Sequence, residues 1–246
     1  MKENGKNTDG HGRAQMEEEG LIPKHGGYRN LKTFQLATLI YDVTVLFCNK
    51  YIDRRSRTHD QMVQAARSGR QNIAEGSVDS GTSKKIELKL TGVAKGSLEE
   101  LRLDYEDFLR QRGLLQWEPD HAALKRFRAK RCATMDEFRA WVAGEMKIAA
   151  QNTDKNNTDM YRQTQTRSGT ASGVRASPCP SVFPQSVSSR DLPAVLAANA
   201  ALSLLNLCIY LLDRQIKVLA EAFEQKGGFT ERLYRRRTAN RNQGNN

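Results

Sequence analysis

Apolar residues recur through residues 194–225 at alternating steps of three and four. That spacing places them on one stripe of an α-helix that would be roughly 48 Å long. Because such a helix is stable mainly through the packing of its apolar face, the pattern predicts partner helices elsewhere in the chain. The series comprises Val195, Ala198, Leu202, Leu205, Ile209, Leu212, Ile216, Leu219 and Phe223.

Further apolar residues lie off this stripe and predict a second buried side, of the kind that packs against another subunit. Residues 192–212 carry no charge and are long enough to span a bilayer. However, polar residues such as Asn199 and Asp213 form a stripe of their own, so we favour a helix in a bundle and expect no membrane association. The second apolar side comprises Leu196, Leu204, Leu207, Leu211 and Val218.

Three earlier segments have the same helical periodicity and predict helices over residues 31–51, 58–75 and 84–112. Gly76 is placed to end the second helix in the left-handed conformation, and Thr82 or Ser83 can cap the third. The inward-facing residues expected on the third helix are Ile86, Leu90, Val93, Leu101, Tyr105 and Phe108, and Gly113 is expected just beyond its end.

The remaining segments differ in composition and predict the domain organisation. Residues 116–150 contain two short helical patterns with few apolar positions, and residues 151–191 are rich in Asn, Thr, Ser, Gln and Pro. We therefore predict an all-α protein, an antiparallel up-and-down four-helix bundle with a helical insertion and a flexible linker between its third and fourth helices. The expected divisions are a disordered tail (1–27), bundle helices 1–3 (28–115), the insertion (116–150), the linker (151–191), bundle helix 4 (192–226), and a short helix with a basic tail (227–246).

Composition indicates an acidic partner. The 246 residues carry 39 Lys and Arg against 28 Asp and Glu, a net charge of +11, and only 38% are hydrophobic. A soluble surface needs charge but not such a bias, so nucleic acid is the simplest partner and an anionic membrane the weaker alternative. None of the four cysteines is spaced as a CxxC pair, and the N-terminus shows no apolar segment typical of a signal peptide, so we expect a cytoplasmic protein.

Basic residues cluster in three segments that we expect to contact phosphates. The first segment brackets the second helix and opens the third, the second is the dense run from Lys125 to Arg131, and the third is the C-terminal tail. Phe127 lies inside the second run and is placed to stack on a base. The expected nucleic-acid-binding residues are Arg54, Arg55, Arg57, Arg67, Arg70, Lys84, Lys85, Lys89, Lys125, Arg126, Arg128, Lys130, Arg131, Arg235, Arg236 and Arg237.

Candidate catalytic chemistry is weak by comparison. Asn72 and Glu75 lie three residues apart beside Gly76, and we interpret them as a buried hydrogen-bonded pair rather than as groups acting on a ligand. The acidic positions of the third helix cannot all point to one metal ion, and the four histidines are scattered. We therefore expect no catalytic residue, no metal site and no cofactor.

Three motifs are similar to a bacterial family. Residues 28–37 (YRNLKTFQLA), residues 71–76 (QNIAEG) with the following Ser-Lys-Lys, and residues 96–101 (GSLEEL) resemble four-helix-bundle proteins encoded in intervening sequences of large-subunit rRNA genes. That family includes the accessory protein of diversity-generating retroelements. The C-terminal part, with LLDRQ at residues 211–215 and GFTERLY at residues 228–234, resembles the "four helix bundle suffix" variant.

The resemblance implies a basic, ring-like homo-oligomer, pentameric in the retroelement members, that binds nucleic acid and a reverse transcriptase. It covers residues 28–113 and 194–237 and leaves the insertion unmatched. From charge and resemblance together we expect a non-catalytic accessory or scaffold protein that binds RNA or DNA phosphates, with a reverse transcriptase or ribosomal RNA as a partner. The alternative is an oligomeric protein–protein scaffold that binds no nucleic acid.

Overall fold

The computed structural model describes residues 26–166, 188 and 190–243, and within them every regular element is a helix and no strand is present. The all-α prediction is therefore confirmed. The predicted tail at residues 1–27 lies almost entirely outside the described residues. In chain order the elements are the 3₁₀-helix η1 (Tyr28–Asn30) and the α-helices α1 (Lys32–Tyr51), α2 (Arg57–Asp79), α3 (Lys84–Gln111), α4 (Ala122–Lys130), α5 (Met135–Thr166), α6 (Leu192–Lys226) and α7 (Phe229–Gln243).

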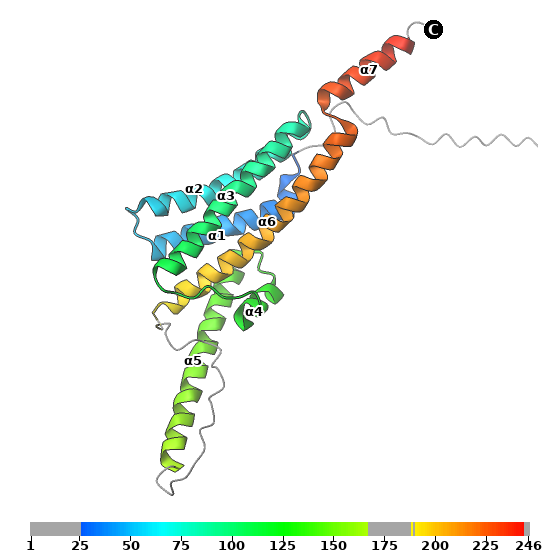
Figure 1. Ribbon diagram of the computed structural model, residues 1–246. Coiled ribbons are helices and arrows are strands. Elements are labelled where there is room, and N and C mark those ends of the chain that lie inside the picture. Colours follow the sequence, from blue (N-terminus) through cyan, green and yellow to red (C-terminus); the bar gives the residue numbers. More distant parts are fainter. Residues whose placement is uncertain (1–25, 167–187, 189, 244–246) are drawn as a thin grey trace, which may run out of the picture.

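Helices α1, α2, α3 and α6 make up the body of the molecule (Figure 1). Helix α1 packs against α2 and α6, and α3 packs against the same two helices. The buried Tyr105 hydroxyl of α3 donates a 3.1 Å hydrogen bond to the Thr44 hydroxyl of α1. Phe47 of α1 contacts the rings of Tyr105 and Phe108, with centroids 4.9 and 4.7 Å away. This aromatic group joins α1 to α3 at the centre of the core.

The helix ends follow local capping rules. The Ser56 hydroxyl accepts a hydrogen bond from the backbone N–H of Thr58 at the start of α2, and Ser83 accepts one from Ile86 at the start of α3. Gly113 follows α3 with a φ of +62°, as predicted for a residue just past a helix end. Each of these ends is therefore set by residues within a few positions of it.

The prediction that Gly76 ends the second helix is wrong. It lies inside α2, which continues to Asp79, and its φ is not positive. A Cβ built on Gly76 would lie 3.4 Å from the Glu87 carbonyl oxygen and from the Leu90 Cβ of α3, and one on Gly69 would lie 2.6 Å from the Leu98 Cδ2. Both glycines therefore lie where α2 closely approaches α3, and neither forms a left-handed turn.

The register of α3 also differs from the prediction. Ile86 and Val93 are each 44% exposed, whereas Glu87 and Thr91 are buried. Small residues explain the shift, because Ala94, one turn beyond Thr91, is fully buried where α2 comes close. The inward face of α3 therefore runs through Glu87, Thr91, Ala94, Leu98, Leu101, Tyr105 and Phe108.

Helix α6 buries the predicted apolar stripe, completely in its first two-thirds and partly beyond Leu212. On the second apolar side, Leu196 and Leu204 are buried within the chain, while Leu207 and Val218 are exposed. Residues 192–231 contain a window long and apolar enough to cross a membrane, but 72% of that window is buried in the structure. Most of this apolar surface therefore packs against protein.

The insertion supplies the covering layer. Helices α4 and α5 pack against α6, and α5 also contacts α1 (Figure 1). Phe127 of α4 and Phe138 and Trp141 of α5 contact one another and belong to the same core as the body helices. The predicted insertion is thus part of the core, because its aromatic residues pack in the same cluster as the body helices.

Two boundaries in the second half of the chain differ from the prediction. Helix α5 continues to Thr166, so residues 151–166 of the predicted linker are helical, and most of its remaining residues lie outside the described ones. Residues 135–166 contain no proline, and Thr134 with Glu137 forms a capping box at the helix start, so nothing local ends the helix at residue 150. After Gly227, the predicted short helix extends through Gln243 as α7.

Candidate nucleic-acid interface

The predicted basic residues of α2 and α3 do not form one patch. Arg54, Arg55 and Arg57 lie at the beginning of α2, and Lys84 and Lys85 follow its end. The 23 residues of α2 separate the two groups by about 34 Å. They therefore form two basic ends of the body, with Arg67 and Arg70 between them.

Three predicted phosphate contacts are already engaged within the protein. Arg70 lies over the ring of Tyr41, with 4.4 Å between the guanidinium carbon and the ring centroid. Lys84 pairs with Glu87 at 2.8 Å. These contacts reduce what each side chain can offer to a phosphate, because binding would replace an existing partner.

Arg126 is the third engaged residue and the most firmly held. Its guanidinium donates two hydrogen bonds, of 2.8 and 2.6 Å, to the buried carboxylate of Glu145 on α5. This bidentate pairing raises the pKa of Arg126. Arg126 therefore fixes α4 to α5 and compensates a buried charge, which corrects its assignment to the binding surface.

The other cations of the α4 run face solvent. Lys125, Lys130 and Arg131 are exposed and form no ion pair within the part of the chain that the structure describes. Arg128 is also exposed and donates a hydrogen bond to the carbonyl of Pro119. Four cations thus lie close together on one short helix and its C-terminal residue, which concentrates positive charge.

Phe127 does not take the role that the sequence suggested. It is 3% exposed and packs against Trp141, with 4.7 Å between the ring centroids. Its position three residues from Leu124, which is also buried, places both on the inner face of α4. The prediction that Phe127 stacks on a base is therefore wrong, because the ring belongs to the core.

The C-terminal cations lie on α7, which extends beyond the body helices (Figure 1). Arg235, Arg236 and Arg237 are exposed and follow one another on this helix. Successive residues of an α-helix point about 100° apart, so the three side chains cover much of its circumference. Helix α7 thus presents positive charge in several directions.

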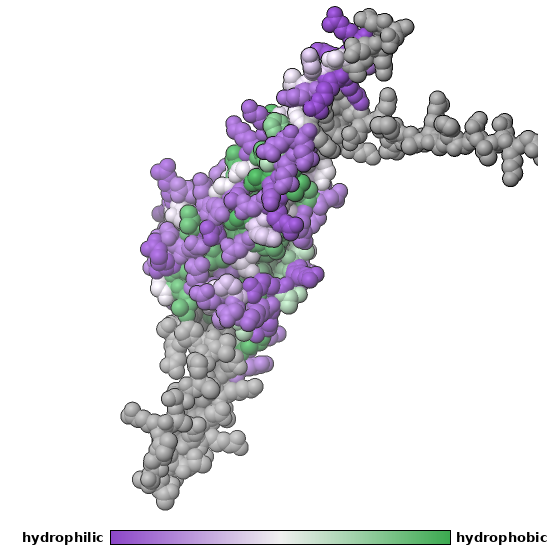
Figure 2. Space-filling model, turned by 45° about the vertical axis from the view of Figure 1, so that its right-hand side comes forward, coloured by the Kyte–Doolittle hydropathy of each residue, from purple (hydrophilic) through white to green (hydrophobic). Residues whose placement is uncertain are grey.

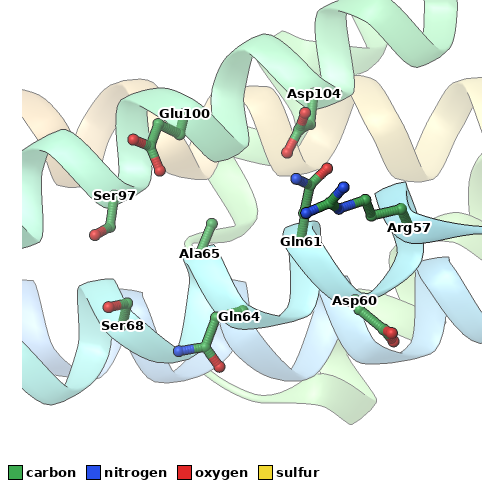
Figure 3. Close-up of a pocket in the computed structure, with 9 residues that line it drawn as sticks. All are labelled: Arg57, Asp60, Gln61, Gln64, Ala65, Ser68, Ser97, Glu100 and Asp104. Carbon is green, nitrogen blue, oxygen red and sulfur yellow. The ribbon is translucent and has the colours of Figure 1, made fainter.

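Acidic residues gather in a groove between α2 and α3, with a volume of about 660 Å³. Figure 3 shows Glu100 and Asp104 of α3 pointing toward α2, with Arg57 and Gln61 opposite Asp104. Burial, and then the charges of Asp107 and Glu100, raise the pKa of Asp104. The charge of this groove is unsuited to phosphate, so Arg57 at its end is a weaker candidate than the cations of α4.

Asn72 and Glu75 do not form the expected buried pair. The Asn72 amide donates a 3.0 Å hydrogen bond to the Ser68 carbonyl of its own helix, and Glu75 is exposed. Because the Asn72 amide turns back toward the preceding turn of α2, it cannot reach the next one. These residues therefore show no arrangement for acid–base chemistry.

Other reactive groups are buried or dispersed. Cys48 and Cys208 are buried, and burial raises the pKa of each thiol to about 12. Within the described residues, no group of three or more His, Cys, Asp or Glu side chains is arranged to hold a metal ion. Cys179 lies outside the described residues.

Sequence reasoning missed a half-buried aromatic residue beside the α4 run. Trp117 lies in the turn before α4, and its ring stacks on His121 with 4.1 Å between the centroids. The available signal was its position: a tryptophan in a polar turn eight residues before Lys125. An aromatic ring near exposed cations is a common element of sites for single-stranded nucleic acid.

Comparison with known proteins adds no assignment, since no family model, curated protein or solved structure matches this chain. The residues and their geometry are therefore the basis for any functional conclusion.

Proposed function

We propose that this protein is a non-catalytic nucleic-acid-binding accessory protein that contacts the phosphates of RNA or DNA through α4 and α7. The observation that carries the proposal is the group formed by Lys125, Arg128, Lys130 and Arg131, whose side chains face solvent and form no salt bridge in the described part of the chain. Unpaired cations attract phosphates and release condensed counterions on binding. The family resemblance of residues 28–37 and 71–76 supports the same conclusion.

The proposed scaffold is an antiparallel up-and-down bundle of α1, α2, α3 and α6. Contacts between distant residues support this topology. Thr33 near the start of α1 donates a hydrogen bond to Gln215 late in α6, and Lys95 in the first half of α3 pairs with Asp213. The first half of α3 and the second half of α6 are thus neighbours, as antiparallel packing requires.

We further propose that the protein self-associates. Leu207, Tyr210 and Val218 are 46, 55 and 63% exposed, and their spacing places them along one side of α6. Hydrophilic residues dominate the face seen in Figure 2, yet hydrophobic ones reach the surface along the middle of the body. An exposed apolar row on a core helix is typical of a contact between subunits. Light scattering after size-exclusion chromatography would show a mass above 27.7 kDa.

The test of nucleic-acid binding is a salt titration with a matched charge control. Fluorescence anisotropy would measure the affinity of a labelled single strand for wild type and for a variant with Lys125, Lys130 and Arg131 each changed to Gln. The control changes three arginines that already pair with carboxylates on their own helices, and it removes the same net charge. These are Arg102, Arg110 and Arg139.

The α4 variant should bind more weakly, and its plot of log affinity against log salt should be shallower by about 2 units, since each single-strand phosphate contact contributes about 0.7. The control variant should keep the wild-type slope. If both variants show the same slope of log affinity against log salt, net charge alone accounts for the binding. Absence of any salt-dependent binding by wild type would support the alternative, an interaction scaffold without nucleic acid.

A further inference from the structure

A cavity of about 270 Å³ lies between α6, α4 and the turn that precedes α4. Trp117 and Gln116 of the turn, Arg128 of α4, and Ser203 and Asn206 of α6 line it. No carboxylate is among its lining residues. Its volume is slightly below the roughly 300–1,000 Å³ of pockets that take drug-sized ligands. The cavity therefore suits one small group that is uncharged or anionic.

The walls of this cavity are held in place before any ligand arrives. Asn199 of α6 is 1% exposed, and its side-chain oxygen accepts a 2.7 Å hydrogen bond from the backbone N–H of Trp117. Its amide nitrogen donates to the carbonyls of Leu115 and Val195, at 3.0 and 2.9 Å. A buried, fully used amide of this kind fixes the turn onto α6, so the position of Trp117 costs little ordering entropy on binding.

The Trp117 ring offers a surface for stacking. One face is covered by His121, whose ring plane lies 17° from that of the indole. Trp117 also lines the cavity, so a flat aromatic ligand held there would have to stack on the face opposite His121. Stacking on an aromatic side chain is available to every nucleobase, because each has a π face.

Polar side chains of the cavity are available to the edge of such a ligand. The side chains of Gln116, Ser203 and Asn206 form no hydrogen bond within the described residues, and each can both donate and accept. Arg128 uses one of its N–H groups on the Pro119 carbonyl, which leaves others for a phosphate. The cavity thus combines a stacking ring, amide and hydroxyl groups, and a cation at its rim.

We propose that this cavity holds one unpaired nucleobase of the bound strand, stacked on Trp117, with the adjoining phosphate on Arg128. The inference rests on the proposed function and deepens it, because it selects single-stranded over fully paired nucleic acid. A base within a duplex is covered on both faces by its neighbours and cannot enter. The base of a free nucleotide has the same chemistry, so the experiment must distinguish a free nucleotide from a strand as the ligand.

The experiment compares labelled single-stranded RNA of mixed sequence with an abasic ribose–phosphate strand of the same length. Affinities for both would be measured by fluorescence anisotropy with wild type, Trp117→Ala and Asn206→Ala. Tyr28→Ala is the matched control, since Tyr28 is a half-buried aromatic residue that packs on Phe34 and does not line the cavity. Uridine monophosphate would be titrated separately, with tryptophan emission as the readout.

Wild type should bind the base-containing strand more tightly than the abasic one, and the strand should quench tryptophan emission. Trp117→Ala should lower affinity for the base-containing strand by about 5- to 150-fold, the range for loss of one stacked base, and leave the abasic strand unaffected. Asn206→Ala, at an exposed position, should lower the preference for the base-containing strand over the abasic strand, whereas Tyr28→Ala should leave that preference unchanged.

Three outcomes would overturn the inference, and they are distinguishable. Equal affinity of wild type for both strands leaves phosphate binding standing but removes the base site. Binding of neither strand overturns the proposed function as well. Quenching by uridine monophosphate that Trp117→Ala abolishes, without any preference between the strands, assigns the cavity to a free nucleotide instead.

Discussion

Substitution of Gly69 by Ala tests how closely α2 and α3 pack. A methyl group at this position would lie 2.6 Å from Cδ2 and 2.8 Å from Cγ of Leu98, a side chain with no exposed surface. Overpacking of this kind costs about 1–3 kcal/mol. Alanine also gains about 1 kcal/mol in helix propensity over glycine. The net expectation is an unfolding free energy lower by about 0–2 kcal/mol.

Gly92→Ala is the matched control. Gly92 lies on α3, is exposed, and a Cβ there would meet nothing within 4 Å. It should therefore gain about 0.5–1 kcal/mol from propensity alone. The difference between the two variants isolates the packing cost, and urea unfolding followed by circular dichroism should separate their midpoints by about 1 M.

The packing argument fails if Gly69→Ala is as stable as Gly92→Ala. A second measurement tests the contact even if the Leu98 side chain moves to relieve the clash. The substitution Leu98→Ala opens a cavity in wild type, but in the Gly69→Ala background it also removes the clash. The cost of Leu98→Ala should therefore be smaller in that background. Equal costs would mean that the two side chains do not meet.

Three further expectations concern charge, thiols and a backbone angle. Asp104→Asn should raise the urea midpoint near neutral pH, because the raised pKa of Asp104 means that folding disfavours its charge, and the gain should vanish at about pH 3. Cys48 and Cys208 should resist thiol reagents unless the protein opens. The free energy of unfolding should fall between pH 9.0 and about 12, because in that range only the thiols of the unfolded chain ionise. Replacing both cysteines with alanine should reduce this fall. Arg131→Gly should stabilise the fold by about 0.5–1 kcal/mol, because Arg131 has a φ of +52°, which glycine adopts more easily. The same substitution should weaken nucleic-acid binding. If the variant binds as tightly as wild type, Arg131 is not part of the interface.

The helices themselves were largely predictable from local pattern. The bounds expected for α1 and α3 agree with the structure to within one residue, because each helix has a clear apolar period and ends at capping residues or glycine. Prediction failed where a small residue is compatible with two different structural positions. Gly76 fits both a helix end and a close helix contact, and only the neighbouring helix distinguishes them.

The candidate site was predictable in charge but not in geometry. The run from Lys125 to Arg131 was identified as basic, yet its periodicity does not show that Glu145, 19 residues after Arg126, takes that arginine as its partner. In the same way, Phe127 and Trp117 are both aromatic residues near cations. Which one is buried depends on the position of α5 and α6 and cannot be read from either residue's neighbours in the chain.

Local sequence thus determines what each segment can form: an apolar period of three and four makes a helix, and an excess of cations makes a positive surface. The contacts between segments decide what those surfaces do. Helix α6 has two apolar sides in its sequence, but folding buries Leu196 and Leu204 on the second side and leaves Leu207 and Val218 exposed. The physical reason is that burial and ion pairing depend on distances between residues far apart in the chain, which no local pattern contains.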